Sequence, residues 1–235
     1  MDDLLIRGGQ LIDGTGAEAR GADVRVRDGT IVGIGSTAGG TARRVIDARG
    51  RVVAPGFIDI KTHSDWTLPL IPQAESKVRQ GVTTEVLGHC GYSVAPALAG
   101  RVEMLRDYLA PSAPWLPFRE TSFAEYMNTF PPTSVNTVMQ VGHNTLRLMV
   151  MGMENRAPTA DEMGAMQELL EEALDAGALG LSSGLFTAPG SWADSDELAV
   201  LAATLRTHGA AYATHVRDEA GGIFESVREA IAIGE

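Results

Sequence analysis

Three residues of the types that bind zinc follow predicted strands at separate points in the sequence. His63 and His215 offer imidazole nitrogens and Cys90 offers a thiolate, and these are donors that zinc prefers. A single histidine at a strand end is often a structural residue, and a single cysteine is often buried and inert. The carboxyl ends of parallel strands meet at one edge of a sheet, however, so these side chains are predicted to converge. His89 adjoins Cys90, and strand alternation directs it away, towards a supporting or structural role.

Other polar residues near these positions could contact a substrate or support the site. Lys61 precedes His63 by two residues, so both side chains are predicted to enter the same cavity. The alternative is that Lys61 turns aside and pairs with Asp65. His143 could donate to a substrate oxygen or form a hydrogen bond within its loop. Arg217 could bind a carboxylate or orient a ligand, or it could be a solvated loop charge.

Five predicted strands position these residues, and the first of them is apolar and expected to be buried. They are 57–60, 82–90, 137–141, 179–185 and 211–215. Thr159 and Glu162 form a capping box for a helix between the third and fourth strands. Asp194 or Ser195 caps the next helix, and 223–233 is predicted to be a final amphipathic helix. Alternating strands and helices indicate an α/β fold with a parallel sheet, here about five βα units of a partial (β/α)8 TIM-type barrel.

The N-terminal residues 1–53 have a different pattern, with short β-type segments only. Asp28-Gly29 suits a type I′ hairpin turn, because both of its central residues need positive φ. We therefore predict a small antiparallel β-module, an incomplete β-sandwich, before the barrel portion at 54–235. Residues 91–132 contain six prolines, too many for one helix, and are predicted to form an insertion over the strand ends.

Composition excludes several classes of function. The chain has 235 residues and a formal net charge of -11, which argues against binding to nucleic acid. There is no charged and apolar leader and no apolar run long enough to span a bilayer, so we expect a cytoplasmic protein without a membrane partner. One cysteine excludes an internal disulfide.

The order of motifs resembles the N-acyl-D-amino-acid deacylases (D-aminoacylases) of the amidohydrolase superfamily. The resemblance covers essentially the whole chain. The motifs are Ala54-Pro55-Gly56-Phe57-Ile58-Asp59, Gly81-Val82-Thr83-Thr84, Gly88-His89-Cys90-Gly91, Gly142-His143-Asn144-Thr145-Leu146-Arg147, Gly177-Ala178-Leu179-Gly180-Leu181-Ser182 and Thr214-His215-Val216-Arg217.

The resemblance implies zinc-dependent hydrolysis of the amide bond of a small-molecule N-acyl-D-amino acid. It implies that Cys90 and His215 hold the main zinc, and that His63 belongs to a second, weaker metal position. Lys61 occupies the place of that position's other histidine. Because an ammonium repels a second cation, we expect one tightly bound zinc.

The resemblance also implies that a further zinc histidine and the catalytic aspartate lie beyond Glu235. The chain is then the N-terminal portion of a longer enzyme, and we expect it to be inactive alone. Two alternatives stay open at this point. A dihydroorotase-like or hydantoinase-like enzyme would need a carbamylated lysine after the fourth strand, but the only lysines are Lys61 and Lys77. A non-catalytic binding or assembly subunit would bind zinc without turnover.

Overall fold

The computed structural model describes residues 1–36 and 40–235, and the chain divides into two compact units. The first unit is Met1–Phe57 and the second is Ile58–Glu235. None of the helices in the described part of the chain combines the length and the apolar character needed to cross a membrane.

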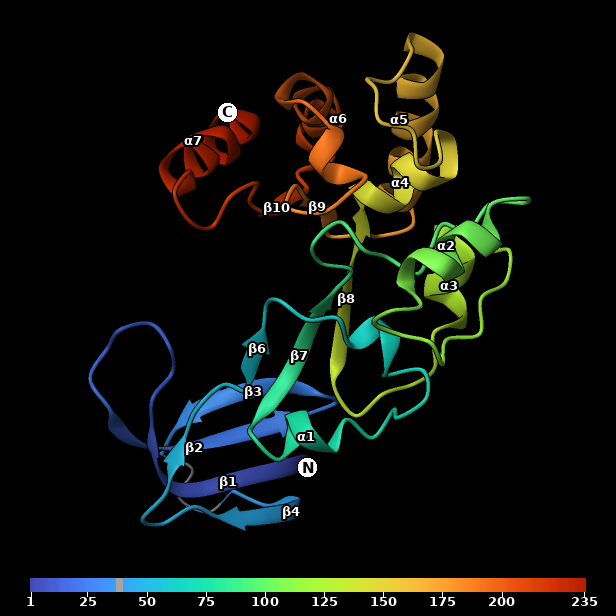
Figure 1. Cartoon of the computed structure of the whole chain (residues 1–235). Coiled ribbons are helices and arrows are strands. Elements are labelled where there is room, and N and C mark those ends of the chain that lie inside the picture. Colours follow the sequence, from blue (N-terminus) through green and yellow to red (C-terminus); the bar gives the residue numbers. More distant parts are fainter. Residues whose placement is uncertain (37–39) are drawn as a thin grey trace. The chain divides into compact units, whose positions relative to one another are not determined.

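The N-terminal unit is a mixed sheet with the strand order β3-β2-β1-β4, and β5 also pairs with β1 (Figure 1). Its strands are β1 (Asp2–Leu11), β2 (Arg20–Arg27), β3 (Thr30–Gly35), β4 (Ala42–Asp47) and β5 (Val52–Val53). The turn between β2 and β3 is as predicted, with φ of +50° at Asp28 and +72° at Gly29. Leu11, Ala22 and Val24 form its small buried core.

The prediction of a purely antiparallel module was wrong. The strands β1, β2 and β3 pair in antiparallel fashion, but β4 and β5 both run parallel to β1. The reason is the order of pairing. Because β2 occupies one edge of β1, the later strands join its other edge, and there they run in the direction of β1.

The second unit is the predicted α/β structure, a partial (β/α)8 barrel with the strand order β6-β7-β8-β9-β10. Pairing is parallel from β7 through β10. The strands are β6 (Phe57–Asp59), β7 (Val82–Leu87), β8 (Asn136–Gly142), β9 (Gly180–Gly184) and β10 (Ala211–His215). Each expected strand is present, and the carboxyl ends that carry the candidate residues lie at the same edge of the sheet.

The first strand of this sheet is not buried as predicted. Phe57 is 66% exposed and Ile58 is 61% exposed. In the described sheet β6 is an edge strand with β7 on one side only. An apolar sequence therefore predicted the strand itself but not its burial.

Two of the helices that cover the sheet begin as their sequence signals predicted. Helix α5 (Ala160–Asp175) starts with the capping box, in which Glu162 N–H donates to Thr159 Oγ1 and Thr159 N–H donates to Glu162 Oε2, at 3.3 Å and 2.8 Å. Helix α6 (Ser195–His208) is capped by Asp194. The final helix is α7 (Ile223–Gly234), and the packing runs from α4 to α5, α6 and α7 in turn (Figure 1).

One of the helices that were not predicted directly follows a strand of the sheet. Helix α4 (His143–Val150) follows β8 directly, and its N-cap, Gly142, has no side chain to signal a helix start. The proline-rich segment 91–132 contains two short helices, α2 (Val102–Leu109) and α3 (Phe123–Thr129), which contact α4 and α5 respectively. Short elements precede β7, namely η1 (Ser64–Trp66) and α1 (Glu75–Val78), and η2 (Gly190–Trp192) follows β9.

The core of the second unit lies between the strands and their helices. Buried strand residues such as Leu87, Val141 and Leu181 pack with Leu170 of α5 and Leu201 of α6. This packing holds the strands against the helices. The candidate polar residues lie at the carboxyl ends of the strands.

Candidate metal centre

The structure brings the three predicted metal ligands to one cavity at the carboxyl ends of the strands. His63, Cys90, His215 and Lys61 all line this cavity, whose volume is about 290 Å³. The remaining residues of its wall are Trp66, Tyr92, Ser112, Gly184, Phe186 and Thr187. Residues far apart in the sequence, from Lys61 to His215, therefore meet at one cavity, as parallel strands require.

Cys90 lies in a tight loop after β7. Its φ is +57°, in the left-handed region that non-glycine residues rarely adopt, and the flanking Gly88 and Gly91 have φ of +75° and +77°. Such a conformation costs about 1 to 3 kcal/mol and is found most often at functional sites. The loop also packs tightly on β9, because a Cβ on Gly184 would lie 2.0 Å from the carbonyl oxygen of Cys90.

This loop explains why the expectation for His89 failed in part. Strand alternation predicted that His89 would face away from the cavity of Cys90. The left-handed turn breaks that alternation. His89 instead lines a second cavity, of about 340 Å³, together with Lys61, Cys90 and His215. Burial, and then the charge of Lys61, lower the pKa of His89.

His63 is held as a neutral imidazole. Its pKa is lowered to about 4, first by burial and then by the positive charge of Lys61, with further electrostatic contributions from His89 and His215. His63 Nδ1 is buried and has no hydrogen-bond partner among the described residues. A neutral ring with a free nitrogen is the form in which histidine binds a metal.

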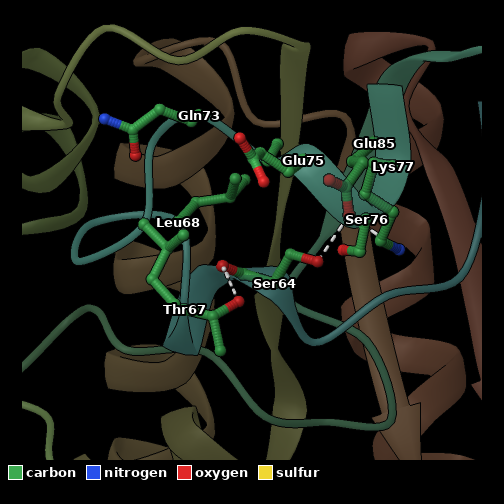
Figure 2. A pocket seen from close by; sticks show the side chains of 10 residues that line it. Ser64, Thr67, Leu68, Gln73, Glu75, Ser76, Lys77 and Glu85 are labelled. Carbon is green, nitrogen blue, oxygen red and sulfur yellow. Dashed lines mark hydrogen bonds and ion pairs between the residues drawn. The ribbon is translucent and has the colours of Figure 1, made fainter. Parts of the chain in front are cut away.

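The segment that presents His63 is anchored by a buried carboxylate (Figure 2). Ser64 Oγ donates to Glu85 Oε2 at 2.5 Å, and Lys77 Nζ lies 3.1 Å from the same oxygen. Lys77 also donates to Asp59 Oδ2 at 2.7 Å, which lowers the pKa of Asp59. The Glu85 side chain is fully buried in β7. Its contacts with Ser64 and Lys77, and the contact of Lys77 with Asp59, therefore join η1, α1, β6 and β7.

The second histidine, His215, ends β10. Its Nε2 lies 3.3 Å from Glu219 Oε1, but this nitrogen is buried and the pair lacks the geometry of a hydrogen bond. Phe186 stacks on its ring, with centroids 5.6 Å apart and planes inclined by 14°. Two buried imidazole nitrogens without hydrogen-bond partners and one thiol thus line a single cavity, a donor set that fits zinc.

The ligand set is not complete within the described residues. No group of three or more His, Cys, Asp or Glu side chains among them lies close enough together to hold a metal ion. His63, Cys90 and His215 therefore share a cavity but do not form a preassembled tetrahedral site.

Lys61 does not pair with Asp65. Within the described part of the chain, the ammonium of Lys61 has no ion pair, and Asp65 is buried, with its pKa raised to about 7 by that burial. The Lys61 side chain instead lines both cavities that contain Cys90 and His215.

His143 and Arg217, the other two candidate substrate contacts, make their hydrogen bonds inside the protein. His143 is fully buried as the first residue of α4, and its Nε2 lies 2.7 Å from Glu197 Oε1. Arg217 donates from Nη2 to Glu229 Oε1 at 2.8 Å and from Nε to Glu229 Oε2 at 3.1 Å. Both side chains therefore have carboxylate partners within the protein.

The sequence did not predict that Glu197 contacts a second buried side chain besides His143. Arg147, which is fully buried, donates to Glu197 Oε2, and its Nη2 donates to the carbonyl oxygen of Arg156 at 2.9 Å. Burial would raise the pKa of Glu197, but the hydrogen bonds and charges of His143 and Arg147 outweigh it and lower that pKa. The only signal in the sequence was an arginine amid the apolar residues of 146–150.

The sequence model of the amidohydrolase family matches residues 44–234. N-acyl-D-aspartate deacylase from Alcaligenes xylosoxydans xylosoxydans is 46% identical over 99% of this chain and 47% of its own length. A structure of D-aminoacylase that describes a binuclear metal centre is 42% identical, with a TM-score of 0.89 over 100% of this chain and 49% of that one. N-acyl-D-glutamate deacylase from Bordetella bronchiseptica, complexed with zinc and a phosphonate inhibitor, is 40% identical, with a TM-score of 0.88 over 99% and 49%.

These comparisons first define the class, a metal-dependent amidohydrolase fold. The chain belongs to the D-aminoacylase, or N-acyl-D-amino-acid deacylase, family of the amidohydrolases. It spans about half the length of the curated relatives that it matches.

Proposed function

We propose that this chain is the N-terminal part of a zinc-dependent enzyme that hydrolyses the amide bond of N-acyl-D-amino acids to a carboxylate and a free D-amino acid. The observation that carries the proposal is the convergence of Cys90, His63 and His215 on one cavity, with two buried ring nitrogens that have no hydrogen-bond partner among the described residues. The activities named for the relatives support the choice of substrate class.

In this proposal Cys90 and His215 hold the tightly bound zinc, and His63 belongs to the second, weaker metal position. A bound zinc lowers the pKa of a water molecule towards neutrality and polarises a carbonyl group. The low pKa of His63 keeps its ring unprotonated at neutral pH. The thiolate of Cys90 adds a negative charge, which offsets part of the charge of the metal.

The surrounding residues orient these donors and shape the space beside them. Trp66 and Tyr92 pack on the ring of His63, and Phe186 packs on the ring of His215. Lys61 adds an ammonium to the described lining of the cavity. Proton transfer to the leaving nitrogen needs a carboxylate, which the proposal places outside this chain.

The test is hydrolysis of N-acetyl-D-methionine compared with its L enantiomer, by the complete protein that contains this chain. We expect D-selective release of methionine that a zinc chelator abolishes and added zinc restores. Cys90→Ser and His215→Asn should lose activity together with bound zinc. His208→Asn is the matched control, because His208 lies at the end of α6, where it pairs with Asp175.

Each outcome decides between the alternatives. Bound zinc without hydrolysis of either enantiomer would contradict the substrate class and favour a different amidohydrolase reaction or a non-catalytic subunit. Hydrolysis that survives complete removal of zinc would contradict the metal centre itself.

A further inference from the structure

A single buried hydroxyl closes the loop that carries Cys90. Gly91 N–H donates to Ser182 Oγ at 3.1 Å, and Ser182 Oγ donates to the carbonyl oxygen of Gly88. Ser182 lies in the middle of β9 and is 0% exposed. Both ends of the tight loop are therefore fixed to a neighbouring strand through one side chain.

The loop needs such a restraint. Cys90 has a left-handed backbone conformation that a non-glycine residue leaves readily unless its surroundings hold it. The carbonyl oxygen of Gly91 also accepts a hydrogen bond from Thr145 N at 3.2 Å, so the loop is attached to α4 as well as to β9. Of these contacts, the hydroxyl of Ser182 is the one that reaches both sides of Cys90.

We propose that Ser182 is a positioning residue for the thiol. Its hydroxyl keeps the loop from Gly88 to Gly91 in the conformation that places the Cys90 side chain at the cavity shared with His63 and His215. The proposal rests on the proposed function for its zinc readout, but the conformation of the loop can be tested without metal.

Ser183 provides a matched control. It is the next residue of β9 and is also 0% exposed, but its hydroxyl bonds to Tyr212 Oη and to Thr214 Oγ1, both at 2.7 Å, in β10. Ser183→Ala removes the hydroxyl of a buried serine from the same strand and leaves both hydrogen bonds to the Cys90 loop in place. Ser182→Ala therefore removes hydrogen bonds to the Cys90 loop, whereas Ser183→Ala removes hydrogen bonds to β10.

The first experiment uses the metal-free complete protein and a disulfide reagent that modifies thiols. The thiol of interest is the one that disappears in Cys90→Ser. Because the side chain of Cys90 is 5% exposed, its modification needs the loop to open. We expect about tenfold faster modification in Ser182→Ala, as the loss of one or two hydrogen bonds would give, and the wild-type rate in Ser183→Ala. Equal rates in the two variants would overturn the proposal.

The second experiment measures zinc affinity by competition with a chelator. Loss of a supporting hydrogen bond typically weakens a protein metal site by about tenfold or more, so Ser182→Ala should bind zinc about tenfold more weakly than Ser183→Ala does. Ser182→Thr, which keeps the hydroxyl, should recover most of the affinity. Wild-type affinity in Ser182→Ala would refute the positioning role.

A second pair of variants covers the case in which Ser182→Ala does not fold. Ser182→Cys keeps a side chain of similar size that forms weaker hydrogen bonds, and Ser183→Cys carries the same added thiol. Weaker zinc binding in Ser182→Cys than in Ser183→Cys supports the proposal, and equal binding contradicts it. Failure of the wild-type protein to bind zinc would refute the proposed function, while the thiol experiment would still decide the role of Ser182 in the loop.

Discussion

The imidazole of His63 and the indole of Trp66 are stacked, with ring centroids 4.6 Å apart and planes inclined by 19°. Tyr92 meets the same imidazole edge on, at 5.9 Å. A metal-binding histidine is usually oriented by a hydrogen bond to its second nitrogen. Here no hydrogen bond to the His63 ring is observed within the described residues, so aromatic packing fixes the plane of the ring.

We predict that this stack is worth about 0.5 to 1.5 kcal/mol of coupling in the unfolding free energy of the metal-free protein. The measurement is a double-mutant cycle with His63→Ala and Trp66→Leu, followed by urea unfolding. A cycle of His63→Ala with Trp115→Leu is the control, because the Trp115 indole donates to the Trp66 carbonyl oxygen at 2.8 Å and no stacking with His63 is observed for it. Additive effects in the His63 and Trp66 cycle would contradict the prediction.

A second prediction concerns the buried carboxylate of Glu197, which joins α6 to α4. Its removal leaves His143 and Arg147 buried without their shared partner. Breaking a buried ion pair on one side costs about 3 to 5 kcal/mol, so Glu197→Ala should lower the unfolding free energy by an amount in that range. Asp196→Asn, at the exposed neighbouring position, should change it little. A loss below about 1 kcal/mol for Glu197→Ala would show that the network contributes only as much as an ordinary surface pair.

The predicted parts of the fold are those with a local cause. The capping box of Thr159 and Glu162, and the cap at Asp194, are hydrogen bonds within one turn, so a short stretch of sequence contains all the residues involved. The convergence of His63, Cys90 and His215 was predictable for a related reason, because parallel strands bring their carboxyl ends together whatever the intervening sequence.

The parts that were missed depend on distant residues or on one unusual backbone angle. Arg147 and Glu197 are 50 residues apart, and periodicity indicates a buried helix face without indicating which polar partner is buried there. The direction in which the His89 side chain points depends on the left-handed φ of Cys90. Gly88 and Gly91 were the only signals of that conformation in the sequence. The exposure of Phe57 depends on which strands lie next to β6.

A third prediction is a pH effect at the start of α5. Hydrogen bonds from Arg156, and then from the backbone of Thr159, lower the pKa of Glu162 to about 2 from an ordinary value of 4.5. The folded state therefore binds this proton less readily than the unfolded state does. The stabilisation is complete above about pH 4.5 and is lost as the pH falls towards 2.

The measurement is urea unfolding of Glu162→Gln and wild type at several pH values. The difference in unfolding free energy should be largest above pH 4.5 and shrink on acidification, with a small amplitude because this ion pair lies at the surface. Asp161→Asn, in the same turn, is the control for the removal of one carboxylate charge. A difference for Glu162→Gln that is constant with pH would show that the hydrogen bonds, and not the charge, provide the stabilisation.

The last prediction concerns the number of metal ions. Lys61 has no ion pair among the described residues and shares both cavities with Cys90 and His215. An ammonium at this place repels a second cation, and because Lys61 is exposed, water and salt weaken that repulsion without abolishing it at short range. We therefore expect one zinc per chain in elemental analysis of the complete protein, although a relative has a binuclear centre.

Two replacements of Lys61 distinguish the effect of its positive charge from the effect of a missing metal-binding imidazole at this position. Lys61→His removes the fixed charge and adds an imidazole beside His63, so we expect a second zinc to bind. Lys61→Met removes the charge and adds no nitrogen donor, and it should stay at one zinc because a single histidine gives the second ion too few ligands. Two zinc ions in wild type would show that the ammonium points away from the metal, and a second zinc in Lys61→Met would show that charge alone had excluded it.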